Sequence, residues 1–160
     1  MPHLSRLAPP EGFRRQQHMA AVFPLELTAE PLIYVVDDEP HLTELYTTLL
    51  EATGCRVRAF NDRAEALAAI RRENRKPDLM VIDGLGNSML ADRFMKLCLA
   101  VCPQLRILMA SGLSRSDVPF LSVRPDRFLQ KPFTPEEFLL EVSATLTSRP
   151  VELHRRAFSK

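Results

Sequence analysis

Apolar and polar positions along the chain follow two periods, one typical of strands and one typical of helices. Short, almost wholly apolar runs predict buried strands at residues 32–36, 79–82, 106–110 and 128–130. Residues 56–60 alternate Arg, Val, Arg, Ala and Phe, which predicts an outer strand with one face in water. The sequence therefore predicts five short strands.

Between these strands, apolar residues recur at the spacing of helices that pack on a sheet. The first helix is expected to begin near Pro40 and to stop at Gly54, and Asp62 with Glu65 has the spacing of an N-cap and its N3 partner. A capping box and a proline at N1 open the last helix at Thr134. The apolar members of the four stripes are Leu42, Leu45, Tyr46, Leu49 and Leu50; Ala66, Leu67, Ala69 and Ile70; Leu90, Phe94, Leu97, Cys98 and Val101; and Phe138, Leu139, Val142 and Leu146.

This alternation of strands and helices predicts an α/β fold, a doubly wound parallel sheet with helices on both faces. Right-handed crossovers then place the carboxyl ends of all strands at one edge of the sheet. In such sheets the binding site lies outside those carboxyl ends.

Polar side chains follow four of the five strands: Asp37 with Asp38, Asp83, Ser111 and Lys131. We expect them to meet at the common edge. Three carboxylates form a hard-oxygen site that suits Mg²⁺, while the lysine and the hydroxyl supply donors for a phosphoryl group. A carboxylate at the end of a buried central strand is a candidate nucleophile that would form an acyl phosphate. That residue is Asp83.

Composition narrows the class of protein. The chain has 160 residues, enough for one domain, and its formal net charge of +1 supplies no global field that would favour nucleic acid as a direct partner. Three cysteines without a CxxC pair indicate a reduced, cytoplasmic setting, and we expect Cys98 and Cys102 to pack in the core. No apolar run approaches the roughly 18 residues of a membrane span.

The two ends differ from the body of the chain. Residues 1–30 are proline-rich and are expected to form a mobile extension, with a short docking helix at 13–23 as the alternative. Residues 31–148 form the predicted domain. Residues 149–160 carry four bases and one acid and are predicted to be a basic, solvated tail.

Over about residues 31–148 the chain resembles the receiver domain of two-component response regulators, of the single-domain, stand-alone type. The resemblance rests on the run VVDDEP, on LMVID ending at Asp83, on the pair Ser111-Gly112 and on FLQKPF around Lys131. It implies a flavodoxin-like sheet with the strand order 2-1-3-4-5.

The resemblance also implies a function and a metal. Asp83 would receive a phosphoryl group from a histidine kinase or a histidine phosphotransfer protein. Asp38, Asp83 and the backbone carbonyl of Leu85 would bind Mg²⁺ directly, and Asp37 would bind it through water. The protein would then be a signalling module without a separate turnover activity, and it would act on a downstream protein target or relay the phosphoryl group.

The remaining family positions map onto the later strands. Lys131 would contact a phosphate oxygen, and the peptide bond between Lys131 and Pro132 would be cis. Ser111 would bond the phosphoryl group and shift, which would let Phe128 turn inward.

Three residues are expected to flank the phosphoryl group: Gly112, Leu85 and Leu113. The two leucines offer no hydrogen bond to an attacking water molecule. We therefore predict a long-lived acyl phosphate.

The segment between Ser111 and Lys131 departs from the family. It is slightly short and contains Pro119 and Pro125, and a proline inside a helix costs about 3 kcal/mol. The fourth helix of the family is therefore expected to be short or irregular. We accordingly do not expect the usual symmetric receiver dimer, which uses this helix, and the oligomeric state stays open.

Three other functions remain as alternatives. A degenerate receiver would act as a scaffold that needs no phosphorylation, which the shortened segment favours. A phosphatase of the haloacid dehalogenase type also uses an aspartate nucleophile, but its Asp-x-Asp motif would place Glu39 at the second aspartate. A flavodoxin-type flavin site fits less well, because acidic residues would occupy the loop that holds the phosphate.

Overall fold

The computed structural model describes residues 30–84, 88–113 and 121–148. Along the chain its elements are β1 (Leu32–Val36), α2 (Pro40–Glu51), β2 (Arg56–Phe60), α3 (Arg63–Arg72), β3 (Leu79–Asp83), α4 (Ser88–Val101), β4 (Arg106–Ser111), β5 (Arg127–Gln130) and α5 (Pro135–Thr147). The five strands form one sheet in the order β2-β1-β3-β4-β5, and every neighbouring pair is parallel. The predicted fold class is confirmed.

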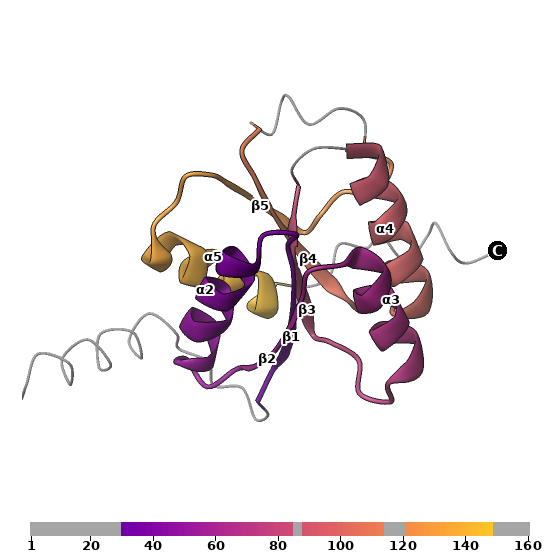
Figure 1. Cartoon of the computed structure of the whole chain (residues 1–160), viewed down its shortest axis with the longest axis horizontal. Coiled ribbons are helices and arrows are strands. Elements are labelled where there is room, and N and C mark those ends of the chain that lie inside the picture. Colours follow the sequence, from indigo (N-terminus) through magenta and orange to yellow (C-terminus); the bar gives the residue numbers. More distant parts are fainter. Residues whose placement is uncertain (1–29, 85–87, 114–120, 149–160) are drawn as a thin grey trace, which may run out of the picture.

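Helices cover both faces of the sheet. Figure 1 shows α2 and α5 on one face and α3 and α4 on the other. Successive side chains of a strand point to opposite faces, so Val35 and Val81 pack in the core under α2 and α5, whereas Val36 and Ile82 pack under α3 and α4. Burial on both faces explains why the central strands are apolar throughout.

Two leucines of the predicted helical stripes do not pack in the core. Leu45 is 47% exposed and Leu90 is 53% exposed, so their assignment to the buried stripes was wrong. Each precedes a buried residue, Tyr46 and Ala91 respectively, and neighbouring positions lie about 100° apart around a helix. The buried face of α2 is centred on Tyr46 and Leu50, which turns Leu45 to the surface.

The predicted helix starts are confirmed. The Asp62 carboxylate accepts a hydrogen bond from the Glu65 amide at 2.9 Å, which begins α3. At the start of α5, Thr134 and Glu137 form the expected capping box. These caps fix where each helix begins, and therefore where the side chains near the sheet edge originate.

The segment between β4 and β5 is the least regular described part of the domain. Residues 112–113 and 121–126 contain no helix, and Pro119 lies outside the described residues. The Asp92 carboxylate of α4 accepts hydrogen bonds from the Ser122 hydroxyl at 2.7 Å and from the Val123 amide at 3.0 Å. The described end of this segment is thus held against α4.

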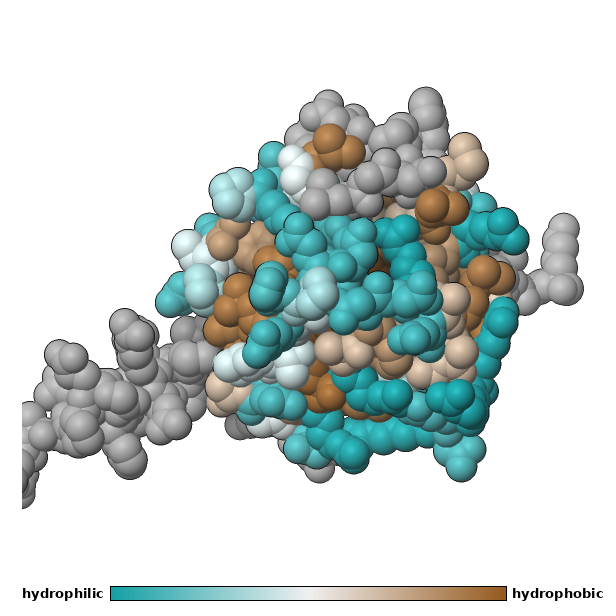
Figure 2. Space-filling model, in the orientation of Figure 1, coloured by the Kyte–Doolittle hydropathy of each residue, from teal (hydrophilic) through white to brown (hydrophobic). Residues whose placement is uncertain are grey.

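The cysteines lie in the core, and the surface is mostly hydrophilic. Cys98 and Cys102 are buried, as predicted, and burial with the nearby Cys102 thiol raises the pKa of the Cys98 thiol to about 12. The viewed face is mostly hydrophilic with scattered hydrophobic residues (Figure 2). Among the described residues, no helix is long and apolar enough to cross a membrane. The predictions for residues 1–29, Leu85 and the basic tail at 149–160 lie outside the described residues.

Candidate functional site

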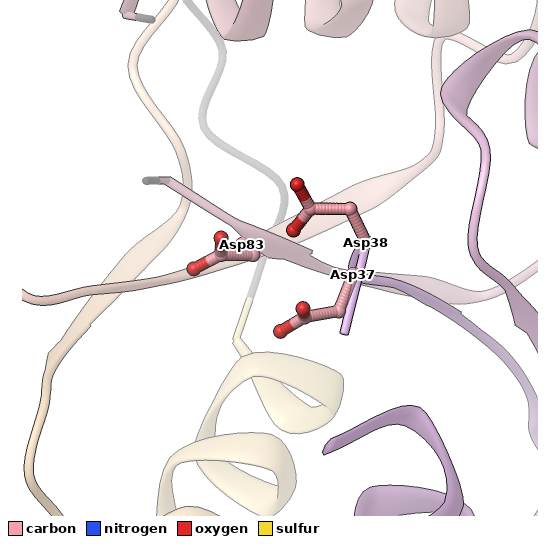
Figure 3. A group of neighbouring side chains, drawn as sticks. All are labelled: Asp37, Asp38 and Asp83. Atoms are coloured by element: carbon pink, nitrogen blue, oxygen red, sulfur yellow. The ribbon is translucent and has the colours of Figure 1, made fainter. Parts of the chain in front are cut away.

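The ends of β1 and β3 bring three carboxylates together. Val36 pairs with Ile82 in the parallel register, so the acids that follow these residues emerge side by side. The ligand atoms of Asp37, Asp38 and Asp83 all lie within 4.8 Å of one another. Figure 3 shows the carboxylates of Asp37 and Asp38 directed toward the same space as that of Asp83. The predicted meeting of these acids is confirmed.

The three carboxylates differ in their contact with solvent. Asp37 and Asp83 are each 5% exposed, whereas Asp38 is exposed. Burial, above all, raises the pKa of Asp37, and the charges of Asp83 and Asp38 raise it further. The Glu39 amide, which donates to Asp37 Oδ1 at 2.9 Å, acts in the opposite direction. A buried set of like charges favours a cation at this position.

Lys131 supplies a positive charge at the site. Its Nζ lies 2.9 Å from Asp83 Oδ1 and 3.6 Å from Asp37 Oδ2. Burial alone would lower the pKa of Lys131, but the hydrogen bond to Asp83 and the charges of both acids outweigh it and raise the pKa. The ammonium group therefore stays protonated.

Alternation along the strands explains why these three side chains meet. Leu129 packs in the core under α2 and α5. Lys131 follows Leu129 by two residues, just as Asp83 follows Val81 and Asp37 follows Val35. Side chains two residues apart point to the same face of a sheet, so all three point toward one side. The peptide bond between Lys131 and Pro132 is cis, as the resemblance implied.

Ser111 lies at the same edge, but its side chain points to the other face of the sheet. Its side chain is fully buried, and its Oγ accepts a hydrogen bond from the Leu113 amide at 3.1 Å. Its carbonyl oxygen accepts one from the Lys131 amide at 2.7 Å. A Cβ placed on Gly84 would lie 3.0 Å from the Ser111 Cβ, so the residue after Asp83 packs directly against this serine.

The remaining predicted site residues are Gly112, Leu113, Phe128 and Leu85. Gly112 and Leu113 are exposed beside Ser111, and Phe128 is partly buried and packs against the core on the α3 and α4 face. The inward turn of Phe128 remains a prediction. Leu85, expected to flank the phosphoryl group and to offer its carbonyl to the metal, lies outside the described residues.

Two residues after β2 also reach this edge, and the sequence analysis missed them. Asn61 Nδ2 donates to the Asp37 carbonyl oxygen at 2.9 Å, and Arg63 Nη2 donates to the Asp83 carbonyl oxygen at 3.2 Å. A signal for them exists in the sequence. Because β2 is also a parallel strand, the polar run that follows Phe60 must lie at the same edge.

Comparison with known proteins agrees with this geometry. The sequence model of the response regulator receiver domain matches residues 33–143. The chain belongs to the response regulator receiver domain family. Receiver domains of this family are signalling modules of two-component systems.

Similar full-length proteins carry this domain as one part. The phosphate regulon transcriptional regulatory protein PhoB of Pseudomonas aeruginosa is 31% identical over 118 residues, which cover 71% of this chain and 51% of that protein. The DNA-binding response regulator MtrA of Mycolicibacterium smegmatis is 30% identical over 127 residues, covering 74% and 52%. The chain thus spans about half the length of these relatives.

Solved receiver structures share the fold. A response regulator from Thermotoga maritima matches with a TM-score of 0.66 at 23% identity, covering 75% of this chain and all of that one. A CheY-like receiver protein from Methanospirillum hungatei gives a TM-score of 0.65 at 21% identity, covering 80% and 99%.

The donor set fits the divalent cation that receiver domains generally bind at an acidic pocket. Carboxylate oxygens are the ligands that Mg²⁺ prefers, and the exposed Asp38 keeps one side of the cluster open to the waters that Mg²⁺ retains. Asp37, Asp38 and Asp83 are the described residues that would hold it.

Proposed function

We propose that this receiver domain accepts a phosphoryl group on Asp83 from a histidine kinase or a histidine phosphotransfer protein. The observation that carries the proposal is the contact of 2.9 Å between Lys131 Nζ and Asp83 Oδ1, beside two further carboxylates. An ammonium group on a buried carboxylate next to a cation site is the arrangement that aspartyl phosphorylation needs.

The chemistry is a phosphoryl transfer between two residues. A carboxylate oxygen of Asp83 forms a bond to phosphorus while the bond between phosphorus and the donor histidine nitrogen breaks, and the electron pair stays on that nitrogen. Mg²⁺, when bound to the acidic cluster, supplies positive charge that offsets the repulsion between the carboxylates and the phosphoryl oxygens. This chain would catalyse its own modification, with no further turnover.

The neighbouring residues have separate roles in the proposal. Lys131 would move from the Asp83 carboxylate to a phosphoryl oxygen, because its ammonium is already within hydrogen-bonding distance of the acceptor. Ser111 would donate its hydroxyl hydrogen to the phosphoryl group and give up the bond from Leu113. That movement next to β5 would allow Phe128 to turn inward and change the surface offered to a partner.

We also propose a cellular location and a class of partner for this domain. The domain would act in the cytoplasm and would signal through a downstream protein or relay the phosphoryl group to another histidine. The names of the two relatives describe transcriptional regulation and DNA binding by those proteins. We propose protein contact for this domain, since its nearly balanced charge of +1 gives no attraction to nucleic acid.

The test is phosphorylation of the purified protein by a small-molecule phosphodonor, with and without Mg²⁺, followed by intact mass. We expect a Mg²⁺-dependent gain of one phosphoryl group that disappears in Asp83→Asn. Asp78→Asn is the matched control, because Asp78 precedes the opposite end of β3 and its carboxylate accepts the Leu32 amide at 2.8 Å. That variant should be phosphorylated like the wild type.

A second function has one observation in its favour. The described residues between β4 and β5 contain no helix, and Ser122 and Val123 are held on α4 by Asp92, so this surface could serve as a fixed scaffold. Absence of any mass gain in the wild type would contradict the phosphoryl acceptor and favour that scaffold. Multiple turnover of a phosphate ester would instead indicate a phosphatase of the haloacid dehalogenase type.

A further inference from the structure

Arg63 reaches the candidate phosphoacceptor from a neighbouring element. It is the first residue of α3, and its Nη2 donates a hydrogen bond to the backbone carbonyl oxygen of Asp83 at 3.2 Å. The cap between Asp62 and Glu65 fixes the start of this helix, and therefore the position from which the arginine side chain extends. The residue is partly buried.

We propose that Arg63 is a positioning residue of the acidic site, which holds the main chain of Asp83 and brings a positive charge to the end of β3, where the acidic cluster lies. The inference deepens the proposed function and rests on it for the effect on phosphorylation. Its effect on Mg²⁺ binding does not require that Asp83 is phosphorylated.

The main chain at Asp83 needs this donor because the sheet ends there. The paired residues of β1 and β3 stop at Val36 and Ile82, and the Asp37 amide that follows β1 donates to Phe60 of β2, on the side away from β3. On the other side the Gly84 amide donates to Ala110 of β4. Asp83 is buried, and a buried carbonyl oxygen without a donor loses the free energy of a hydrogen bond. Arg63 supplies that donor.

Asn61, two residues before Arg63, holds the end of β1, the other strand that is followed by acidic residues. Asn61 donates to the Asp37 carbonyl oxygen at 2.9 Å and to Thr43 Oγ1 at 3.1 Å. Asn61 and Arg63 therefore hold the main chain at the ends of both acidic strands. Only one of the two contacts, that of Arg63, also introduces a charge.

The positive charge of Arg63 leads to a prediction that a purely structural role of this residue would not. A guanidinium group stays protonated at all accessible pH values, and partial burial weakens its screening by water. From its position on the Asp83 carbonyl oxygen it would repel Mg²⁺ in the acidic cluster and attract an anionic phosphodonor. Removing the charge should therefore strengthen Mg²⁺ binding and weaken the use of the phosphodonor, whereas simple loss of geometry would weaken both.

The test compares Arg63→Gln, which keeps a hydrogen-bond donor without the charge, with Arg63→Lys, which keeps the charge. Arg106→Gln is the matched control, because Arg106 is also partly buried and its Nε donates to the Ser148 carbonyl oxygen at 3.1 Å, at the opposite end of β4. Mg²⁺ binding is measured by titration calorimetry of the full chain at low and high salt. Phosphorylation by a small-molecule phosphodonor is followed by intact mass at saturating Mg²⁺.

We expect Arg63→Gln to bind Mg²⁺ about threefold more tightly at low salt and to need about threefold more phosphodonor for half-maximal rate. High salt should reduce the difference in Mg²⁺ affinity. Arg63→Lys and Arg106→Gln should resemble the wild type in both measurements.

Unchanged Mg²⁺ binding in Arg63→Gln, or weaker binding in both Arg63 variants, would overturn the inference. If Arg63→Gln does not fold, Arg63→Lys decides: affinity near that of the wild type supports the inference, and a tenfold loss overturns it. A wild type that takes up no phosphoryl group, together with tighter Mg²⁺ binding in Arg63→Gln, would refute the proposed function and leave the charge of Arg63 supported.

Discussion

Gly84 and Ser111 are packed so closely that a Cβ on the glycine would lie 3.0 Å from the Cβ of the serine. The same Cβ would lie 3.1 Å from Cγ and Sδ of Met109. Gly84 directly follows the candidate phosphoacceptor, and Ser111 carries the hydroxyl that we expect to bind the phosphoryl group. The absence of a side chain at Gly84 therefore sets the position of Ser111.

We predict that Gly84→Ala lowers the free energy of unfolding by about 1–3 kcal/mol, because the added methyl group must displace buried neighbours. Urea denaturation measures this change. Phosphorylation should also slow, because Ser111 moves with its Cβ.

Gly54→Ala is the control for this prediction. Gly54 has a φ of +87° and open space around a Cβ, so alanine there costs about 1 kcal/mol through the backbone alone. It should leave the phosphorylation rate unchanged. A Gly84→Ala variant with normal stability and normal phosphorylation would show that the contact with Ser111 is easily relieved.

Lys131 offsets the repulsion between two buried carboxylates. The side chains of Asp37 and Asp83 are 3% and 4% exposed, and the lysine ammonium lies 3.6 Å and 2.9 Å from their carboxylate oxygens. Lys131→Met should lower the free energy of unfolding by about 2–3 kcal/mol in the presence of a chelator, because it leaves both charges unpaired. Mg²⁺ should stabilise this variant more than the wild type, since a cation then replaces the ammonium.

Lys96→Met provides the comparison. Lys96 pairs with Asp92 at 3.0 Å along α4, but the lysine side chain is 46% exposed, so its loss should change stability by about 0.5 kcal/mol or less. Its response to Mg²⁺ should equal that of the wild type. Equal responses of the Lys131 variant and the wild type to Mg²⁺ would mean that the ammonium and the metal do not substitute for each other.

The sequence predicted the sheet and the acidic cluster because both depend on simple repeating geometry. Apolar runs mark the central strands, and parallel strands must present their carboxyl ends at one edge, which brought Asp37 and Asp83 together. The exposure of Leu45 was not predicted, since the exact rotation of a helix depends on packing against its neighbours. Arg63 was missed for another reason: its place after β2 indicates the edge, but a hydrogen bond from a long side chain to a backbone carbonyl leaves no periodic pattern.

Glu73 makes stability depend on pH at a place remote from the acidic cluster. Its carboxylate pairs with Arg58 and accepts a hydrogen bond from the Tyr34 hydroxyl at 2.9 Å. The bond from Arg58, followed by that from Tyr34, lowers the pKa of Glu73 in the folded protein. The unfolded chain therefore binds this proton more tightly than the folded protein does.

Glu73 consequently stabilises the protein above the unfolded pKa of about 4.3, and this contribution is lost as the pH falls through the lower folded pKa. We predict that Glu73→Gln melts at a lower temperature than the wild type at pH 7 and that the difference disappears in acid. Thermal melts between neutral and acidic pH measure it. Glu44→Gln, at an exposed position of α2, should follow the wild type throughout. A constant gap between Glu73→Gln and the wild type at all pH values would contradict the prediction.

Leu113 bears on how long an acyl phosphate would last. Its amide donates to Ser111 Oγ at 3.1 Å, and its side chain is 43% exposed at the edge where the phosphoryl group would lie. An apolar side chain there cannot orient an attacking water molecule, so we expect slow hydrolysis in the purified wild-type protein. Leu113→Asn places a hydrogen-bonding amide at this position and should shorten the half-life severalfold.

Loss of the phosphoryl group after removal of the phosphodonor, followed by intact mass, measures this lifetime. Leu140→Asn is the matched control, because Leu140 is a leucine of α5 with a similar exposure of 53%. It should leave the half-life unchanged. A wild-type half-life of seconds would rule out protection by the leucines. Equal decay in Leu113→Asn and Leu140→Asn would place the control of hydrolysis elsewhere in the site, because, of these two leucines, only Leu113 contacts Ser111.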